Sequence, residues 1–342
     1  PQTIDVLKTR AEPIGIQLVI DSPNKFNFTD QVFGYLIQCP TTDGKVFDYG
    51  LICDKAHHVG AFVAVATDLL SLAIIPEPGS FDADIAIGSS QRFGVPLGFG
   101  GPHAAFLAAK ENFKRKMPGR IIGLSKDSHD NQALRMALQT REQHIRRDKA
   151  TSNICTAQVL LSVIAGMYAV YHGPKGIYEI AHSVHSNARK LATALTNGGY
   201  KIVHDQFFDT IRISLNGKNP ELEKAEMNFR EFDNGDIGIA IDETSTDSDI
   251  AKIIKIFGVN FKSKSEYKLT SSRNTQYLLH EVFNSYHSET EMMRYLKKLE
   301  SKDLSLNTSM ISLGSCTMKL NAAAEMTPIS WPEFNTIHPF AP

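Results

Sequence analysis

The sequence predicts an α/β fold built around a mainly parallel sheet, and two observations support this prediction. Short apolar runs with many β-branched residues, typical of buried strands, recur up to residue 109. Segments with helical periodicity or turn-forming residues lie between them, as expected when crossover helices connect parallel strands. After residue 150, long apolar helices are followed by strands that alternate apolar and polar residues, which predicts a second, α+β region.

Two helices and five strands are predicted in the first region. One helix covers residues 1–11, with a proline in its first turn, and the other covers residues 47–58 and ends before Gly60. Prolines and glycines in residues 40–44 and 74–80 predict a turn and a loop. The predicted strands cover residues 16–20, 33–39, 61–66, 84–88 and 103–109.

The second region, up to residue 259, is predicted to hold four helices and four strands. Residues 151–153 can cap its first helix, and Gly258 ends its last helix. From residue 260 a polar linker precedes one more helix over residues 289–299 and a mostly coiled end. The helices of the second region cover residues 154–171, 178–196, 220–227 and 247–257, and its strands cover residues 200–204, 209–215, 229–231 and 236–242.

Residues 89–103 form a glycine-rich stretch directly after a predicted buried strand. Four glycines and two prolines lie between residues 94 and 102, so the stretch is predicted to be a rigid, irregular loop. Backbone amides in such loops can hold a phosphate, but a tight structural connection is an equally good interpretation. The stretch matches neither a Walker loop nor a dinucleotide-binding fingerprint.

Composition indicates a globular protein and argues against several classes. The chain has 342 residues, 42% of them hydrophobic, and a net charge of −1, so no preference for nucleic acid or a membrane surface follows. Its four cysteines are scattered with no pair at metal-ligand spacing, which argues for a reducing compartment and against a disulfide framework. The dense, mixed charges of residues 138–149 are predicted to form a salt-bridged connector rather than a substrate site, and the basic residues 114–120 a solvated surface.

Four runs of the sequence resemble the P-protein of the glycine cleavage system. They are residues 89–103, 137–158, 282–290 and 313–321, and together they relate nearly the whole chain to that family. The resemblance implies a fold-type-I pyridoxal-phosphate-dependent transferase-like architecture. Its mainly parallel large domain would cover residues 1–150, incomplete at its N-terminus, and its small α+β domain residues 151–259. Residues 260–342 would be a linker and the start of a second, catalytic half.

The resemblance also implies that this is the non-catalytic half. The catalytic half of the family carries His-Lys-Thr-Phe before its glycine-rich loop, and that lysine forms the Schiff base with the cofactor. Here the matching residues 90–93 read Ser-Gln-Arg-Phe, so Gln91 stands in the place of the lysine. An amide cannot form an imine, and we therefore expect no catalytic residue here and no activity from this part alone.

Cofactor-binding residues are expected near the end of the chain. Ser315, Thr317 and Lys319 lie in the run that begins the catalytic half, and they are predicted to bind cofactor phosphate or substrate carboxylate. The alternative interpretation is a polar linker. The acid that pairs with the cofactor nitrogen matches Val65 best, and for nearby Asp68 a helix cap is favoured over a cofactor role.

The remaining histidines and cysteines that could be reactive are predicted to have structural roles. His57 and His58 are adjacent and point in different directions on a helix, so they are not a metal pair. His103 follows a turn and is interpreted as a satisfied structural residue, with a place at the interface of the halves as the alternative. Cys53 and Cys155 fit buried helix positions.

The full chain is expected to be glycine dehydrogenase (decarboxylating). It would use pyridoxal phosphate, bound mainly by the catalytic half, to decarboxylate glycine and pass aminomethyl to the lipoyl group of the H-protein. The expected partners are therefore glycine, H-protein, the catalytic half and a second copy in a homodimer. The compartment would be the mitochondrial matrix in a eukaryote and the cytoplasm otherwise. The alternatives are a scaffold or regulatory half without chemistry and another fold-type-I enzyme, such as an aminotransferase.

Overall fold

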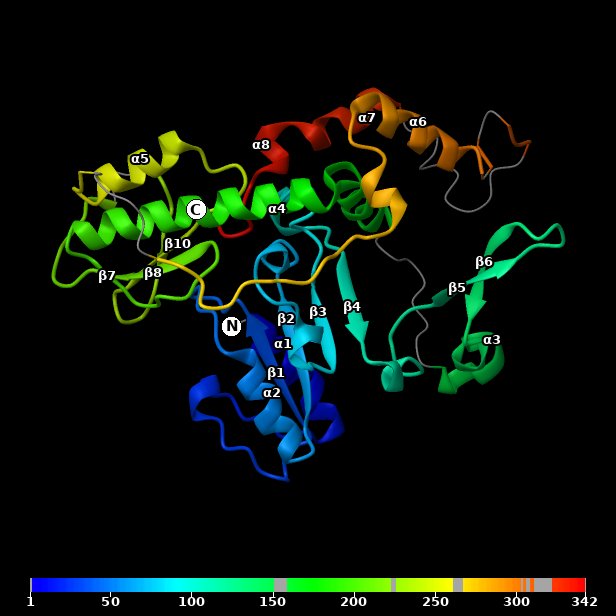
Figure 1. Ribbon diagram of the computed structural model, residues 1–342, viewed down its shortest axis with the longest axis horizontal. Coiled ribbons are helices and arrows are strands. Elements are labelled where there is room, and N and C mark those ends of the chain that lie inside the picture. The colour runs from blue at the N-terminus through cyan, green and yellow to red at the C-terminus, as the bar shows by residue number, and fades with distance from the viewer. Residues whose placement is uncertain are drawn as a thin grey trace.

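The structure is a computed structural model that describes residues 2–150, 159–222, 226–260, 267–302, 304–305, 308–310 and 322–341. A main sheet lies at its centre, and a long helix extends from above this sheet to a second, small sheet (Figure 1). A hairpin lies on the other side of the main sheet, away from the small sheet (Figure 1).

The main sheet has four strands and is mainly parallel, as predicted. Its first three strands run parallel in sequence order, and the fourth returns antiparallel beside the third. Successive connections place each new strand at the edge of the growing sheet (Figure 1). The strands are β1 (Gly34–Cys39), β2 (Phe62–Thr67), β3 (Ile85–Ser89) and β4 (Ala105–Ala109).

One face of the main sheet forms the core. Alternate residues of β1 and β2 are buried, among them Ile37, Val63 and Val65, because side chains of a strand point alternately to opposite faces. Helix α2 (Tyr49–His58) begins at Asp48, whose carboxylate accepts a hydrogen bond from the Leu51 amide, and it packs on this face. The same core continues into the small sheet.

The predicted strand over residues 16–20 is wrong. Helix α1 (Gln2–Ala11) forms as predicted, but residues 16–20 have no regular structure, and Val19 is 72% exposed. A β-branched run forms a strand only where neighbouring strands and a buried face are available.

The two long helices predicted after residue 150 are both present, and they join end to end across a kink as α4 (Val159–Asn197). It bends at Gly173, where φ is 62° and ψ is −178°, just before Pro174. Proline removes a helical hydrogen bond and clashes with the preceding turn, which accounts for the bend. The predicted cap at residues 151–153 lies outside the described residues.

The small sheet is antiparallel, with strand order β7-β8-β10-β9. Its strands are β7 (Lys201–Ile202), β8 (Thr210–Ser214), β9 (Arg230–Glu231) and β10 (Ile237–Ala240). Helix α5 (Asp247–Ile256) follows and ends before Gly258, as predicted. Of the helix predicted over residues 220–227, only Leu222 has helical (3-10) geometry among the described residues 220–222 and 226–227, and residues 223–225 lie outside the described chain.

The hairpin was not predicted from the sequence. Strands β5 (Ile121–Lys126) and β6 (Gln132–Ala137) pair with each other, and the short helix α3 (Gln143–Arg146) lies beside them (Figure 1). Toward the C-terminus, α6 (Glu289–Glu300) forms as predicted. Two short helices, α7 (Ala323–Met326) and α8 (Pro332–Asn335), interrupt the predicted coil.

Candidate functional site

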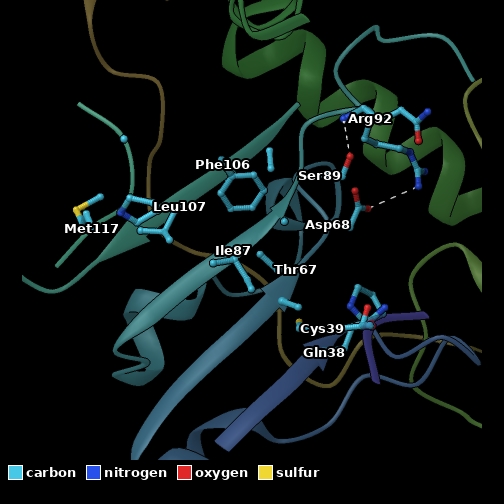
Figure 2. Close-up of a pocket in the computed structure, with 18 residues that line it drawn as sticks. Gln38, Cys39, Thr67, Asp68, Ile87, Ser89, Arg92, Phe106, Leu107 and Met117 are labelled. Carbon is cyan, nitrogen blue, oxygen red and sulfur yellow. Dashed lines mark hydrogen bonds and ion pairs between the residues drawn. The ribbon is translucent and has the colours of Figure 1, made fainter. Parts of the chain in front are cut away.

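A cavity of about 1020 Å³ opens at the carboxyl ends of β1, β2 and β3. One residue from each strand of the main sheet lines the cavity, and these residues lie in register across the sheet: Gln38, Ala66, Ile87 and Leu107. The cavity therefore lies on the face of the main sheet opposite the core. Figure 2 shows polar Ser89, Asp68 and Arg92 at one end and apolar Leu107 and Met117 at the other. Ligands of open α/β sheets bind beyond the carboxyl ends of the strands, which makes this cavity the candidate site.

Gln91 lines this cavity, in the turn that follows β3. Its backbone amide donates to the Ser89 hydroxyl at 3.1 Å, and its side-chain amide donates to the Pro96 carbonyl at 3.4 Å. An amide nitrogen is not a nucleophilic amine, so Gln91 cannot bind an aldehyde covalently. The described residues that line the cavity include no lysine to replace it.

Asp68 lies at the mouth of the cavity, where β2 ends, and its carboxylate is engaged by the protein itself. It accepts hydrogen bonds from the amides of Leu70 at 3.3 Å and Ser71 at 3.2 Å at the start of the short 3-10 helix over Ser71–Ala73, although Leu70 and not Asp68 holds the N-cap position of that helix. Arg92 Nη1 lies 3.7 Å away (Figure 2). Burial raises the pKa of Asp68 to about 6, against the opposing effect of the Arg92 charge.

Val65 does not line the cavity. Its side chain is fully buried in the core, on the other face of β2 from Ala66. An acid at Val65 would therefore point away from the cavity in this structure, whereas position 68 reaches it. With no lysine on the described lining and with Asp68 already bonded to protein groups, the residues present do not fit covalently bound pyridoxal phosphate.

Residues 97–100 of the glycine-rich loop pack against the C-terminal segment, whereas Ser89, Gln91 and Arg92 at the start of the same stretch line the cavity. The amide of Phe99 donates to the carbonyl of Ile337 at 2.9 Å. The amide of Gly100 donates to the carbonyl of Leu97. A Cβ atom placed on Gly100 would lie 2.8 Å from Cβ of Pro339. Because these amides bond within the chain, the loop supports the structural interpretation and not a phosphate cup.

The charged connector contains two buried residues, Arg141 and Glu142, each less than 5% exposed. The Arg141 guanidinium donates to the Met117 carbonyl at 2.6 Å and also to the Gly119 carbonyl. Its Nε lies 3.5 Å from the Glu142 carboxylate. The pair holds the loop before β5 in place, in agreement with the salt-bridged connector predicted from the sequence.

The structure separates the other predicted residues. His57 bonds the buried Asp84 at 2.9 Å while His58 is exposed, and His103 is exposed rather than satisfied in the core. Cys53 is buried, as predicted, and burial raises the pKa of its thiol to about 11, so it is a poor nucleophile. Ser315, Thr317, Lys319 and Cys155 lie outside the described residues.

No group of three or more histidine, cysteine or acidic side chains is placed to hold a metal ion in the part of the chain that the structure describes. Among the described helices, none combines the length and apolar character needed to cross a membrane.

Comparison with known proteins relates nearly the whole chain to one family. The family model of the glycine cleavage system P-protein matches residues 1–257. Glycine dehydrogenase (decarboxylating) of Nostoc punctiforme is 54% identical over the whole chain, and the mitochondrial protein of Dictyostelium discoideum is 51% identical. The chain spans 37% of the length of the first and 36% of the second.

A solved structure has the same fold. The crystal structure of a glycine decarboxylase (P-protein) in inhibitor-bound form matches with a TM-score of 0.68 and 31% sequence identity, over 75% of this chain and 62% of that chain. The fold-type-I architecture expected from the resemblance, a mainly parallel sheet with an α+β part, is therefore confirmed.

Proposed function

Because the chain belongs to the glycine cleavage system P-protein family, we propose that it is the non-catalytic half of a glycine decarboxylase. The observation that carries this proposal is Gln91 on the wall of the candidate cavity, where the catalytic half of the family has its Schiff-base lysine. The relatives that the chain matches are nearly three times as long, which leaves room for a catalytic half in the same polypeptide.

The proposed full-length enzyme decarboxylates glycine and transfers aminomethyl to the lipoyl group of the H-protein. Pyridoxal phosphate supplies the electron sink for this decarboxylation and is bound mainly by the catalytic half. In this proposal Ser315, Thr317 and Lys319 reach the cofactor phosphate or the substrate carboxylate from the segment that begins that half. Residues 1–150 and 151–259 form the large and small domains of the present half.

Two surfaces support a role as a scaffold for the catalytic half. The glycine-rich loop already packs on residues 337–339, in the part of the chain that we assign to the start of that half. One face of the hairpin carries Ile122, Leu124 and Leu134, which are 56%, 72% and 72% exposed. An isolated two-stranded hairpin is marginally stable in water, so an apolar face of this kind fits packing against a further part of the protein.

A separate non-catalytic subunit is the second candidate, because Gln91 alone is compatible with it. The length of the relatives favours the single-chain form. We also propose a homodimer. Since the relatives include bacterial proteins and a mitochondrial one, we propose the mitochondrial matrix for a eukaryotic source and the cytoplasm for a bacterial one.

Borohydride reduction of the full-length protein with pyridoxal phosphate, followed by peptide mapping, tests the proposal. The reduced adduct is expected on a lysine outside residues 1–342, and the protein should exchange CO2 with the carboxyl group of glycine when H-protein is present. An adduct on a lysine within residues 1–342 would overturn the assignment of this half. Absence of both adduct and exchange would overturn the enzymatic function.

A further inference from the structure

Arg92, next to Gln91, lies between the main sheet and the small sheet and contacts acidic side chains from both. We propose that Arg92 is a clamp that holds the two sheets in one fixed arrangement, so that this half presents an unchanging surface to its partner. The clamp does not depend on glycine chemistry, although its consequence for a partner rests on the function proposed above.

Three carboxylates surround the Arg92 guanidinium. Its Nη1 lies 2.7 Å from Asp209 and 3.7 Å from Asp68, and its Nε lies 3.4 Å from Glu243. Asp68 follows β2 of the main sheet, whereas Asp209 precedes β8 and Glu243 follows β10 of the small sheet. One side chain therefore connects residues that lie 117 and 151 positions further along the chain.

The environment makes these contacts stronger than ordinary surface ion pairs. The side chains of Arg92, Asp68, Asp209 and Glu243 are at most 35% exposed, and the guanidinium carbon lies 5.9 Å from the centre of the Phe208 ring. Partial burial reduces screening by water and salt. Three acids share one cation, so removing Arg92 leaves like charges facing one another across the junction.

Arginine suits this position better than lysine or threonine. Its planar group offers several fixed donors that can meet carboxylates on different sides at once, whereas lysine offers one compact charge. The sequence resemblance places threonine at this position in the catalytic half, and threonine is too short and uncharged to connect the same three acids.

A second network crosses the same junction. Asp43, in the turn after β1, accepts hydrogen bonds from His204 at 2.7 Å and Arg212 at 3.3 Å, both from the small-sheet region. The Val46 amide also donates to the Gln206 carbonyl at 2.9 Å. The sheets are therefore tied together at two places, and a change at Arg92 alone should loosen the junction without unfolding the core.

Hydrogen exchange measured by mass spectrometry on the full-length protein tests the clamp. Arg92→Gln should raise exchange about ten- to a hundredfold in peptides that cover residues 207–215 and 240–246, the range expected for losing charge-assisted contacts. Arg92→Lys should give a smaller rise. Asp209→Asn, the milder variant, should raise exchange in the same peptides. The double variant should exchange no faster than Arg92→Gln alone, because the ion pair is already lost there and one of the facing acids is removed.

Arg135→Gln, on the exposed hairpin strand β6, is the matched control and should leave these peptides at the wild-type rate. Peptides from β1 and β2 should keep their protection in every variant. Wild-type exchange at residues 207–215 in both Arg92→Gln and Asp209→Asn would overturn the clamp. An equal rise in all peptides would also overturn it, because Arg92 would then support overall stability alone. CO2 exchange measured in parallel tests the catalytic proposal separately.

Discussion

Replacing Gly100 by alanine should release the C-terminal segment from the glycine-rich loop, and Gly98 provides a matched control in the same loop. Both glycines have positive φ, +50° at Gly98 and +94° at Gly100, so an alanine at either position is strained. A Cβ on Gly98 meets nothing within 4 Å, whereas one on Gly100 would lie 2.8 Å from Cβ of Pro339. Only Gly100→Ala therefore forces the two segments apart.

The structure gives an approximate size for the difference. Alanine in the left-handed region costs about 1–2 kcal/mol, which is the whole effect expected for Gly98→Ala. At Gly100 the backbone strain is similar or larger, and displacement of Pro339 also breaks the 2.9 Å hydrogen bond from Phe99 to Ile337, which adds about 1 kcal/mol. Gly100→Ala should thus destabilise the loop contact by about 1–2 kcal/mol more than Gly98→Ala.

Thermal melting and hydrogen exchange of the full-length variants measure this difference. We expect exchange in residues 331–341 to rise about tenfold in Gly100→Ala and to stay near the wild-type rate in Gly98→Ala. The melting temperature should fall further in Gly100→Ala. Equal effects of the two variants on residues 331–341 would refute the reasoning, because backbone strain alone would then explain both.

The remaining predictions concern Lys319 and Asp43. Lys319→Ala in the full-length enzyme should reduce glycine-dependent CO2 exchange about ten- to a hundredfold with little change in the melting temperature, since a charge-assisted contact is lost; unchanged exchange and cofactor titration would indicate a solvated linker. The hydrogen bond from His204 lowers the pKa of Asp43, so the folded state binds this proton less readily than the unfolded state. The resulting stabilisation is present above about pH 4 and is lost as the pH falls below it, so in urea unfolding Asp43→Asn should show a weaker loss of stability on acidification than the wild type. The same pH dependence in both proteins would contradict this assignment.

Elements whose signals are local were predicted well from the sequence. Helix α2 covers most of the segment predicted over residues 47–58, and α5 ends before the predicted stop at Gly258. The strands β1 to β4 follow apolar runs beside turn-forming residues. These signals depend on atoms within a few positions of one another, so they can be read before the fold is known.

The sequence was less informative where partners lie far apart along the chain. The run at residues 16–20 has strand propensity but forms no strand, because no sheet lies beside it to pair with. The hairpin of β5 and β6 depends on pairing between two six-residue segments whose apolar residues by themselves do not predict strands. Propensity is a weak guide wherever tertiary contacts decide the outcome.

That residue 91 cannot form an imine with an aldehyde is clear from the sequence, because Gln91 is an amide whatever surrounds it. Only the tertiary structure placed Gln91 on the wall of a cavity and brought Asp209 and Glu243 to Arg92 from 117 and 151 positions away. Chemical identity is a property of one residue and is visible in the sequence. A cavity or an ion-pair network depends on where the strands end and how the sheets meet, and the folded chain alone decides that.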